Sequence, residues 1–596
     1  MITINISEGL RLNMISSKYI AIICSLLLVA CSHTPQRDAG QVRMLESSAA
    51  DQRDAERERE LAAMKLPNVE LTDQILYQFL LGDIAVQRDQ MELATEAYLE
   101  LAKSTRDPRL ARHASHLAFE TRQVDKMMEA SQVWQELEPD SVRAKQMLAA
   151  MLLTNEKIGK ARPIVLEILA DNPAHAAEVF MQLYPMLSRY PDKNAAYELM
   201  HELSASYPAV AEGKLLVAQL AEASGKHEIA LEEARMASKL RPEWDAAVLL
   251  NAQLQQQETP QKSVTLVKDY LVDYPDNKEV RLYYARLLTE LKQHREARTQ
   301  FQLLLDEVPD NPDLAFAVAL LSLELGEFDR AESGLQIALR NGKKDESAVH
   351  YYLGQLNEAK NADEAALQSY RKVQSGEYAF PAQLRLAYLL NKTGKLMEAR
   401  QQLQQAHADN DQQRAQLIML EAKILRDAKQ PEAAYQVLFQ GLDKMPDSPD
   451  LLYEAGMLVD QMGQHETFER MVRKLIQLRP DYAHGYNALG YSLLDRNVRV
   501  SEGMQLVEKA FRLAPDDPAI MDSVGWGHYR MGDLSKSEEF LRRAYTANPD
   551  PEIAAHLGEV LWVRGDKEEA KKVWQQAFLA HSDNAVLAAV MKKFLP

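Results

Sequence analysis

Prolines recur along this 596-residue chain at an almost constant spacing. Successive steps are 33, 34 or 35 residues within each of two runs, and the 137 residues between the runs are close to four such steps. Each proline follows a helical pattern and forces the residue before it out of the α region, so it ends one unit before the next begins. A period of this length predicts a repeat array rather than several separate globular cores. The prolines are Pro139, Pro173, Pro208, Pro242, Pro275, Pro309, Pro446, Pro480, Pro515 and Pro549.

Small residues recur at fixed offsets from these prolines. One stands twelve residues before the proline, as at Ala161 and Ala230, and another stands about twelve residues further upstream, as at Ala218 and Gly490. Small residues on facing helices let two backbones approach closely, so each unit is predicted to be a tight pair of antiparallel helices. A turn residue such as Gly225 often lies between the two helices.

The clearer units carry an aromatic or apolar residue, then Leu-Gly, a central alanine, a second alanine and a closing proline, and in this they resemble the tetratricopeptide repeat. The resemblance implies an all-α, right-handed superhelical solenoid of about fifteen helix pairs over residues 69–584, closed by a capping helix at 585–596. Units near Pro139 and between Pro242 and Pro275 match poorly, and three others replace the central alanine with Phe468, Gly503 or Ser537. The clearest unit carries Tyr486, Leu489, Gly490, Leu493, Val507, Ala510 and Pro515.

Residues 1–30 have the pattern of an export signal. A basic residue precedes the apolar run Ile20–Ala30, which at 11 residues is too short to span a bilayer, since a spanning helix needs about 20. The run ends at Cys31 in a segment that resembles the lipobox of bacterial lipoproteins. The resemblance implies cleavage before Cys31, a lipid on that cysteine and, because Ser32 follows it, anchoring at the periplasmic face of the outer membrane. An ordinary signal with an incidental cysteine is the alternative, and Met14 is an alternative start.

Residues 31–68 are polar and contain no aromatic side chain. Such a stretch cannot bury enough surface to fold alone, so it is predicted to be a flexible tether after the lipidated cysteine. Only two cysteines occur in the sequence, Cys24 and Cys31, and both precede the repeats. The array therefore has no thiol for a disulfide framework, a thiolate metal site or a catalytic cysteine.

The sequence shows no constellation typical of catalysis, metal binding or a noncovalent cofactor. The 14 histidines are scattered, and His113 and His116 lie one helical turn apart without a third ligand. No phosphate-binding glycine loop and no nucleophile elbow occurs. A net charge of −18 opposes nonspecific binding to the nucleic-acid backbone. It also argues against RNA binding of the kind performed by similar repeats of about 35 residues that form helical pairs. We therefore predict a protein that is not an enzyme, with no catalytic residue, no metal and no cofactor beyond the lipid on Cys31.

One face of the first helix in each unit is not explained by packing. If the small residue is numbered 8, positions 4, 7, 8 and 11 are buried in the stack, whereas positions 5, 9 and 12 lie about 110° away at about 100° per residue. The resemblance implies that this second face lines an inner groove. Trp, Tyr and Arg dominate binding energies at interfaces, so large side chains here are candidate anchors for a protein; filling the space between units is the alternative. The candidates are Asn487, Tyr491, Asp522, Trp526, Tyr529, Arg530, Glu559 and Trp562.

The C-terminal repeats and the lipobox together are similar to one group of outer-membrane tetratricopeptide lipoproteins. Some members of that group act as adaptors for periplasmic carboxyl-terminal processing proteases and present cell-wall hydrolases for degradation. The resemblance therefore implies a membrane-anchored protein-binding scaffold with such a protease and its substrates as partners. A structural scaffold of an envelope secretion or polysaccharide-export complex is the alternative, and the sequence does not fix the oligomeric state.

Overall fold

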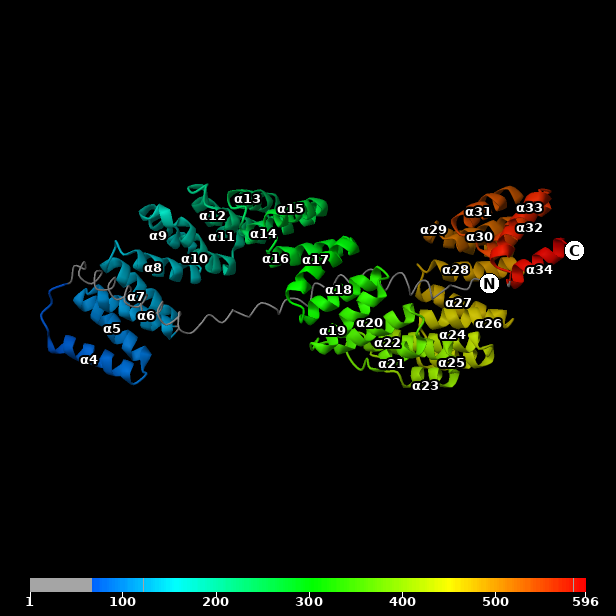
Figure 1. The fold of residues 1–596 in the computed structure, drawn as a ribbon, viewed down its shortest axis with the longest axis horizontal. Helices are drawn as coiled ribbons and strands as arrows, with labels where there is room; N and C mark the ends of the chain where they lie inside the picture. Colours follow the sequence, from blue (N-terminus) through cyan, green and yellow to red (C-terminus); the bar gives the residue numbers. More distant parts are fainter. Residues whose placement is uncertain (1–66, 122, 583, 596) are drawn as a thin grey trace. The chain divides into compact units, whose positions relative to one another are not determined.

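Helices make up most of the chain that the computed structural model describes, which is residues 67–121, 123–582 and 584–595. This part forms 31 α-helices and one short 3-10 helix, with no strand within it (Figure 1). The predicted all-α fold of about fifteen helix pairs is confirmed. None of the described helices is both long and apolar enough to cross a bilayer. Residues 1–66 lie outside the described part, and with them the predicted signal, Cys31, the start at Met14 and most of the tether.

The helices fall into two units, and the first of them ends at Pro309. Within this N-terminal unit consecutive helices pack against each other in pairs, and each pair packs on the next. Its helices are α4 (Asp73–Gln87), α5 (Met91–Thr105), α6 (Pro108–Glu120), α7 (Val124–Leu137), α8 (Val142–Thr154), α9 (Ile158–Asp171), η1 (Pro173–His175), α10 (Ala176–Arg189), α11 (Lys193–Ala205), α12 (Ala211–Ala223), α13 (His227–Leu240), α14 (Asp245–Glu258), α15 (Pro260–Asp273), α16 (Lys278–Glu290) and α17 (His294–Glu307).

The second unit begins at Asp310 and repeats the same arrangement. Its last helix, α34, follows the final pair and occupies the segment that was predicted to cap the array. The helices are α18 (Pro312–Glu324), α19 (Phe328–Arg340), α20 (Glu346–Ala359), α21 (Asp363–Arg371), α22 (Ala379–Lys392), α23 (Leu396–Gln405), α24 (Asp411–Asp427), α25 (Pro431–Lys444), α26 (Pro449–Gln461), α27 (His465–Leu478), α28 (Ala483–Asp495), α29 (Val500–Leu513), α30 (Pro518–Arg530), α31 (Leu534–Ala547), α32 (Pro551–Arg564), α33 (Lys567–Ala580) and α34 (Ala585–Phe594).

The boundary between two pairs is encoded locally. Each of the ten prolines lies two or three residues after the end of a second helix, as Pro515 does after Leu513. The next helix then starts at a polar N-cap. In α30 the cap is Asp517, whose Oδ1 accepts hydrogen bonds from the backbone N–H groups of Ala519 and Ile520 at 2.9 and 3.1 Å. These bonds satisfy donors that the first turn of a helix cannot pair internally.

The short turn inside a pair places one residue in the left-handed region. Glycine takes this position at Gly225 (φ 77°), where a residue without Cβ adopts positive φ at no steric cost. Other pairs use Lys292 (φ 58°) or Asn361 (φ 57°) for the same turn. The glycines seen in the sequence therefore mark only some of the turns.

Close packing within a pair depends on the small residues of the repeat. A Cβ added to Gly490 would lie 2.7 Å from Cγ1 of Val507 and 2.9 Å from the carbonyl oxygen of Gly503. Helices α28 and α29 thus approach backbone to backbone at the unit where Gly503 replaces the central alanine. The departure from the repeat pattern at this unit is accommodated by closer packing of the two helices.

Aromatic side chains close the C-terminal end of the array. Helix α34 packs on α32 and α33. The ring of Trp574 is fully buried and stacks on Phe594 at a centroid distance of 5.7 Å, and it lies 5.8 Å from the ring of Trp562. These rings cover the apolar surface that the last helix pair would otherwise expose.

Candidate protein-binding surface on the last helix pairs

The predicted groove residues lie on three consecutive first helices that pack side by side. Helix α30 contacts both α28 and α32. Side-chain contacts connect six of the eight predicted residues. Of the other two, Asn487 lies one helical turn before Tyr491 on α28, and Trp562 packs elsewhere. The residues are Asn487 and Tyr491 on α28, Asp522, Trp526, Tyr529 and Arg530 on α30, and Glu559 and Trp562 on α32.

The indole of Trp526 is at the centre of these contacts. It stacks on the imidazole of His556, with ring centroids 4.2 Å apart and an interplanar angle of 22°. The ring of Tyr529 lies 4.9 Å away, and the guanidinium carbon of Arg530 lies 4.7 Å from the indole centroid. Stacking and cation–π contacts of this kind hold the rings in fixed orientations. We call Tyr491, Asp522, Trp526, Tyr529, Arg530 and His556 the aromatic cluster.

His556 connects α32 to α30 through a carboxylate. Its Nδ1 lies 2.9 Å from Oδ2 and 3.0 Å from Oδ1 of Asp522, and its Nε2 lies 3.4 Å from the hydroxyl oxygen of Tyr491. Nδ1 must be the donor, because a carboxylate only accepts. Burial by itself would lower the pKa of His556, but the charge and hydrogen bond of Asp522, with the charges of Asp495 and Glu552, raise the pKa above its usual value.

This raised pKa makes the stability of the last helix pairs depend on pH. The unfolded chain releases the His556 proton at a pKa of about 6.5. Because the folded protein holds the proton more tightly, the stabilisation is fully present below that pH and is lost as the pH rises through the folded-state pKa. We expect the thermal midpoint of the native chain to fall between about pH 6 and pH 9 by more than that of a His556→Gln variant, measured by circular dichroism. Parallel pH profiles of the two proteins would contradict this expectation.

Glu559 links the aromatic cluster to the capping helix. Its Oε1 accepts a hydrogen bond from the hydroxyl of Tyr529 at 3.3 Å and pairs with Nζ of Lys593 at 3.0 Å. Burial, together with the charge of Glu559 and its hydrogen bond, raises the pKa of the Tyr529 hydroxyl, which therefore stays a donor. Trp562 instead packs against Trp574 and an aromatic side chain of α34, so it helps to hold the cap.

Three polar atoms on the α28–α30 face have no hydrogen-bond partner within the described chain. They are Nε1 of Trp526, Nε of Arg530 and Oδ1 of Asn487. Leaving a buried polar atom unpaired costs about 1–3 kcal/mol, so such atoms are uncommon in folded proteins. Two of the three are N–H donors and one is an acceptor, which matches the carbonyl and N–H groups that an extended main chain presents. Because all three atoms are buried, only a segment that inserts among these side chains could pair them.

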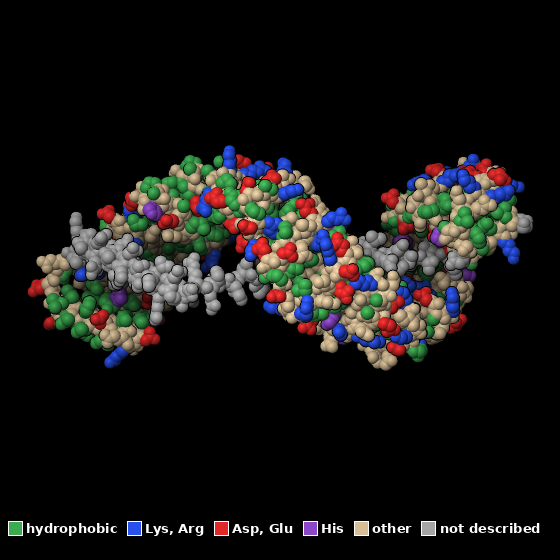
Figure 2. Space-filling view, in the orientation of Figure 1, with side chains coloured by type: hydrophobic (Ala, Val, Ile, Leu, Met, Phe, Trp, Pro, Cys, Tyr) green, Lys and Arg blue, Asp and Glu red, His purple; other side chains and the backbone are tan. Residues whose placement is uncertain are grey.

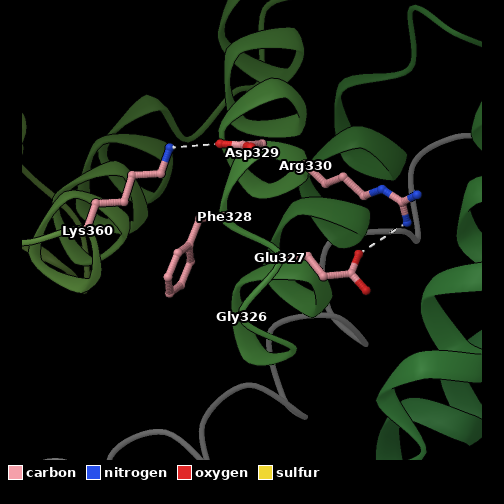
Figure 3. A pocket seen from close by; sticks show the side chains of 6 residues that line it. All are labelled: Gly326, Glu327, Phe328, Asp329, Arg330 and Lys360. Carbon is pink, nitrogen blue, oxygen red and sulfur yellow. Dashed lines mark hydrogen bonds and ion pairs between the residues drawn. The ribbon is translucent and has the colours of Figure 1, made fainter.

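A hollow at the turn between α18 and α19 has a different character. Its charged side chains face one another (Figure 3). Nζ of Lys360 lies 3.5 Å from Oδ1 of Asp329, and a guanidinium nitrogen of Arg330 lies 3.2 Å from Oε2 of Glu327. Because these opposite charges already pair with each other, we assign the hollow to the packing of the turn rather than to a ligand.

The described histidines and charged residues do not form a metal centre. No group of three or more His, Cys, Asp or Glu side chains in the described chain has an arrangement that would hold a metal ion. His113 is exposed and lies edge-on to the ring of Tyr98, with centroids 4.6 Å apart, and His116 lies 6.1 Å from the ring of Trp134. Positive and negative side chains are intermixed over the face drawn in Figure 2.

Sequence comparison finds relatives that share the repeats. Two models of the tetratricopeptide repeat family match residues 254–321 and 316–383. TPR repeat-containing protein PA4667 of Pseudomonas aeruginosa is 31% identical over 486 residues, which are 81% of this chain and 82% of that protein. TPR repeat-containing protein YpiA of Bacillus subtilis is 22% identical over 340 residues, which are 54% of this chain and 77% of that protein.

Solved structures are similar at low sequence identity. The APC/C hetero-tetramer Cut9-Hcn1 matches 82% of this chain and 97% of its own chain, at 14% identity and a TM-score of 0.29. A tetratricopeptide repeat protein from Parabacteroides merdae matches 41% of this chain and 97% of its own, at 16% identity and a TM-score of 0.33. These likenesses concern the fold alone.

Proposed function

Because the chain belongs to the tetratricopeptide repeat protein family, we propose that it is a non-catalytic scaffold that binds other proteins. The repeats of this family support protein–protein interaction as the general role. Helix pairs take up most of the described residues, and each pair packs mainly on its neighbours, as expected of a repeat array that presents surface to other proteins. The comparisons indicate no enzyme family.

The observation that carries this proposal is the set of unpaired polar atoms beside the aromatic cluster. Nε1 of Trp526 and Nε of Arg530 are donors, and Oδ1 of Asn487 is an acceptor. A partner segment that inserts among the side chains of the α28–α30 face would pair these buried atoms and would contact rings that are already fixed by stacking. Pre-ordered aromatic and arginine side chains lose little entropy on binding, which favours affinity.

A finer version of the proposal concerns location and partner. The lipobox at Cys31 supports a lipid anchor at the periplasmic face of the outer membrane, where several acyl chains would give stable attachment. The resemblance to adaptor lipoproteins supports a carboxyl-terminal processing protease as the partner and cell-wall hydrolases as the cargo. Mass spectrometry of the mature first residue tests the anchor independently of the partner.

A double variant, Asn487→Ala with Trp526→Phe, tests the binding face. Phenylalanine keeps a ring in the stack but removes the Nε1 donor, and alanine removes an oxygen that has no partner in the described chain. We expect the amount of protease and hydrolase captured from detergent-solubilised envelopes to fall about tenfold, which corresponds to about 1.4 kcal/mol. Both side chains are buried, so the thermal midpoint is measured alongside and capture is compared at a temperature well below the midpoints of both proteins.

The matched control is Gln505→Ala, an exposed position on α29 of the same pair, which should leave capture unchanged. A photo-crosslinker in place of Tyr529 then identifies what lies on the face. Crosslinks to integral components of a secretion or polysaccharide-export complex would show that the protein is a structural scaffold of that complex rather than a protease adaptor. Undiminished capture by the double variant would move the binding site away from α28 and α30.

A further inference from the structure

Helix α4, the first of the array, is apolar on all sides and yet largely uncovered. It buries only Gly82 and Ala85, whereas α12 in the same unit buries eight residues. A helix that is hydrophobic around its whole circumference is normally a core helix, covered by neighbours. The large side chains of α4 that remain exposed are Leu76 (43%), Tyr77 (65%), Phe79 (43%), Leu80 (48%) and Ile84 (46%).

The repeat architecture explains which neighbour is missing. Later first helices in the N-terminal unit pack on the second helix of the pair before them, as α6 does on α5 and α12 does on α11, except that α10 packs on α8 and η1. Helix α4 packs on α5 and has no such predecessor among the described helices. The C-terminal end of the array is closed by α34, and no described helix has the corresponding place on α4. Hydrophobic side chains gather at α4 on the face drawn in Figure 2, at the lower left as located in Figure 1.

The charges beside this face indicate what would cover it. Glu70, Asp73, Asp89 and Glu92 are exposed, and Arg88 is the basic residue among them. An isologous contact with a second copy would bring two acidic rims together and would be repelled. A partner with basic side chains flanking an apolar stripe would instead be attracted by this rim and would bury the exposed rings.

We propose that the exposed face of α4 is a docking site for an amphipathic helix of another protein, with apolar residues at i, i+3, i+4 and i+7 and Lys or Arg beside them. The helix would take the place that a second helix takes inside the stack, so it would make the same kind of apolar contact that α5 makes with α6. This surface lies on the N-terminal unit and is separate from the α28–α30 face proposed above.

Fluorescence anisotropy with the full chain and two labelled peptides tests the site. Both peptides have about 18 residues with leucine at the helical spacing above; one carries lysine and the other glutamate at the flanking positions. We expect the lysine peptide to bind at least about tenfold more tightly than the glutamate peptide. The neutral double variant Tyr77→Ser with Leu80→Ser should weaken lysine-peptide binding by about tenfold or more, because it removes apolar contact without changing charge.

The matched control is Val272→Ser, since Val272 is an apolar side chain of the same unit that is 73% exposed on another helix, α15. Binding of the lysine peptide should be unchanged in this variant. Equal binding to native chain and the Tyr77→Ser, Leu80→Ser variant would overturn the proposal, because general attraction of a cationic peptide to an acidic protein would then explain the signal.

A photo-crosslinker at Tyr77 in the full chain identifies which of the candidate occupants contacts the exposed face of α4. Crosslinks to the lysine peptide, mapped by mass spectrometry, support the docking site. Crosslinks that instead join Tyr77 to residues 32–66 of the same chain, or to a second copy in a dimer that the serine variant dissociates, would overturn the proposal. Both of these results are independent of partner capture at α28 and α30.

Discussion

Replacing Gly558 with alanine is expected to destabilise the last helix pairs by about 2–3 kcal/mol. A Cβ at this position would lie 2.0 Å from Nε1 of Trp574, a separation that real Cβ atoms do not reach. Trp574 is fully buried and stacks on Phe594 of the capping helix, so the indole cannot swing aside without disturbing α34. Hydrogen exchange of the amides in α32, α33 and α34 would measure the loss, because exchange reports local opening in a repeat array.

The equivalent residue three pairs earlier provides the control. Gly456 occupies the same repeat position in α26, and a Cβ there would lie 3.3 Å from Cγ2 of Val472, the nearest atom. Alanine is the better helix former by about 1 kcal/mol, which offsets the slightly tight contact. We therefore expect Gly456→Ala to change stability little. Similar losses in both variants would show that helix spacing, rather than the indole, sets the tolerance at this repeat position.

Changing Phe468 to alanine is expected to cost about 3–5 kcal/mol, although alanine is the residue that the repeat pattern favours at this position. Phe468 is fully buried on α27 and packs in one cluster with Val459, Val472 and Leu489 of α26, α27 and α28. Removing the ring leaves a cavity that neighbouring helices fill only in part. Chemical denaturation combined with exchange of α26 to α28 would measure the effect.

The exposed Gln477 on the same helix serves as the reference position. Gln477→Ala should leave stability almost unchanged, since surface substitutions usually fall within about 0.5 kcal/mol. If Phe468→Ala were as stable as the native chain, the repeat's preference for alanine would hold here too and the buried ring would not be needed for stability. Packing around Gly456 and the neighbouring helix pair would then not determine how large the side chain at position 468 must be.

Much of the fold follows from short-range sequence signals. A proline restricts the residue before it and cannot continue a helix, so each of the ten prolines marks the end of a second helix to within three residues. Small residues at fixed offsets determine which faces meet inside a pair. These two signals act locally and repeat, and they were enough to predict an all-helical array of about fifteen pairs, which the structure confirms.

The irregular pairs were less predictable because long-range packing overrides local preference there. Pro163 lies inside α9 and Pro185 inside α10, although proline normally weakens a helix interior. A short 3-10 segment, Pro173–His175, precedes α10 as well. The units that match poorly, near Pro139 and between Pro242 and Pro275, still form the helix pairs α6–α7 and α14–α15, because contacts between helices outweigh weak local signals.

The candidate site shows the same division between local and long-range information. Helical spacing alone groups residues on one face of α28 and of α30, because that grouping depends only on the period of the helix. His556 was missed because its significance lies in its contact with Asp522, 34 residues earlier on another helix. Trp562 was assigned to the same face by spacing, but the structure packs it against Trp574 next to the cap.

Because α4 is largely exposed, unfolding of the N-terminal unit is expected to start at this helix. In a stack held together by neighbours alone, loosening starts where a pair has one neighbour instead of two. Since α4 buries only Gly82 and Ala85, it is the weakest point of attachment in that unit, and fraying should advance from it toward α5 and α6. A protein bound to α4 would slow this fraying, so the fraction of α4 that is occupied would also affect how long the N-terminal unit stays folded.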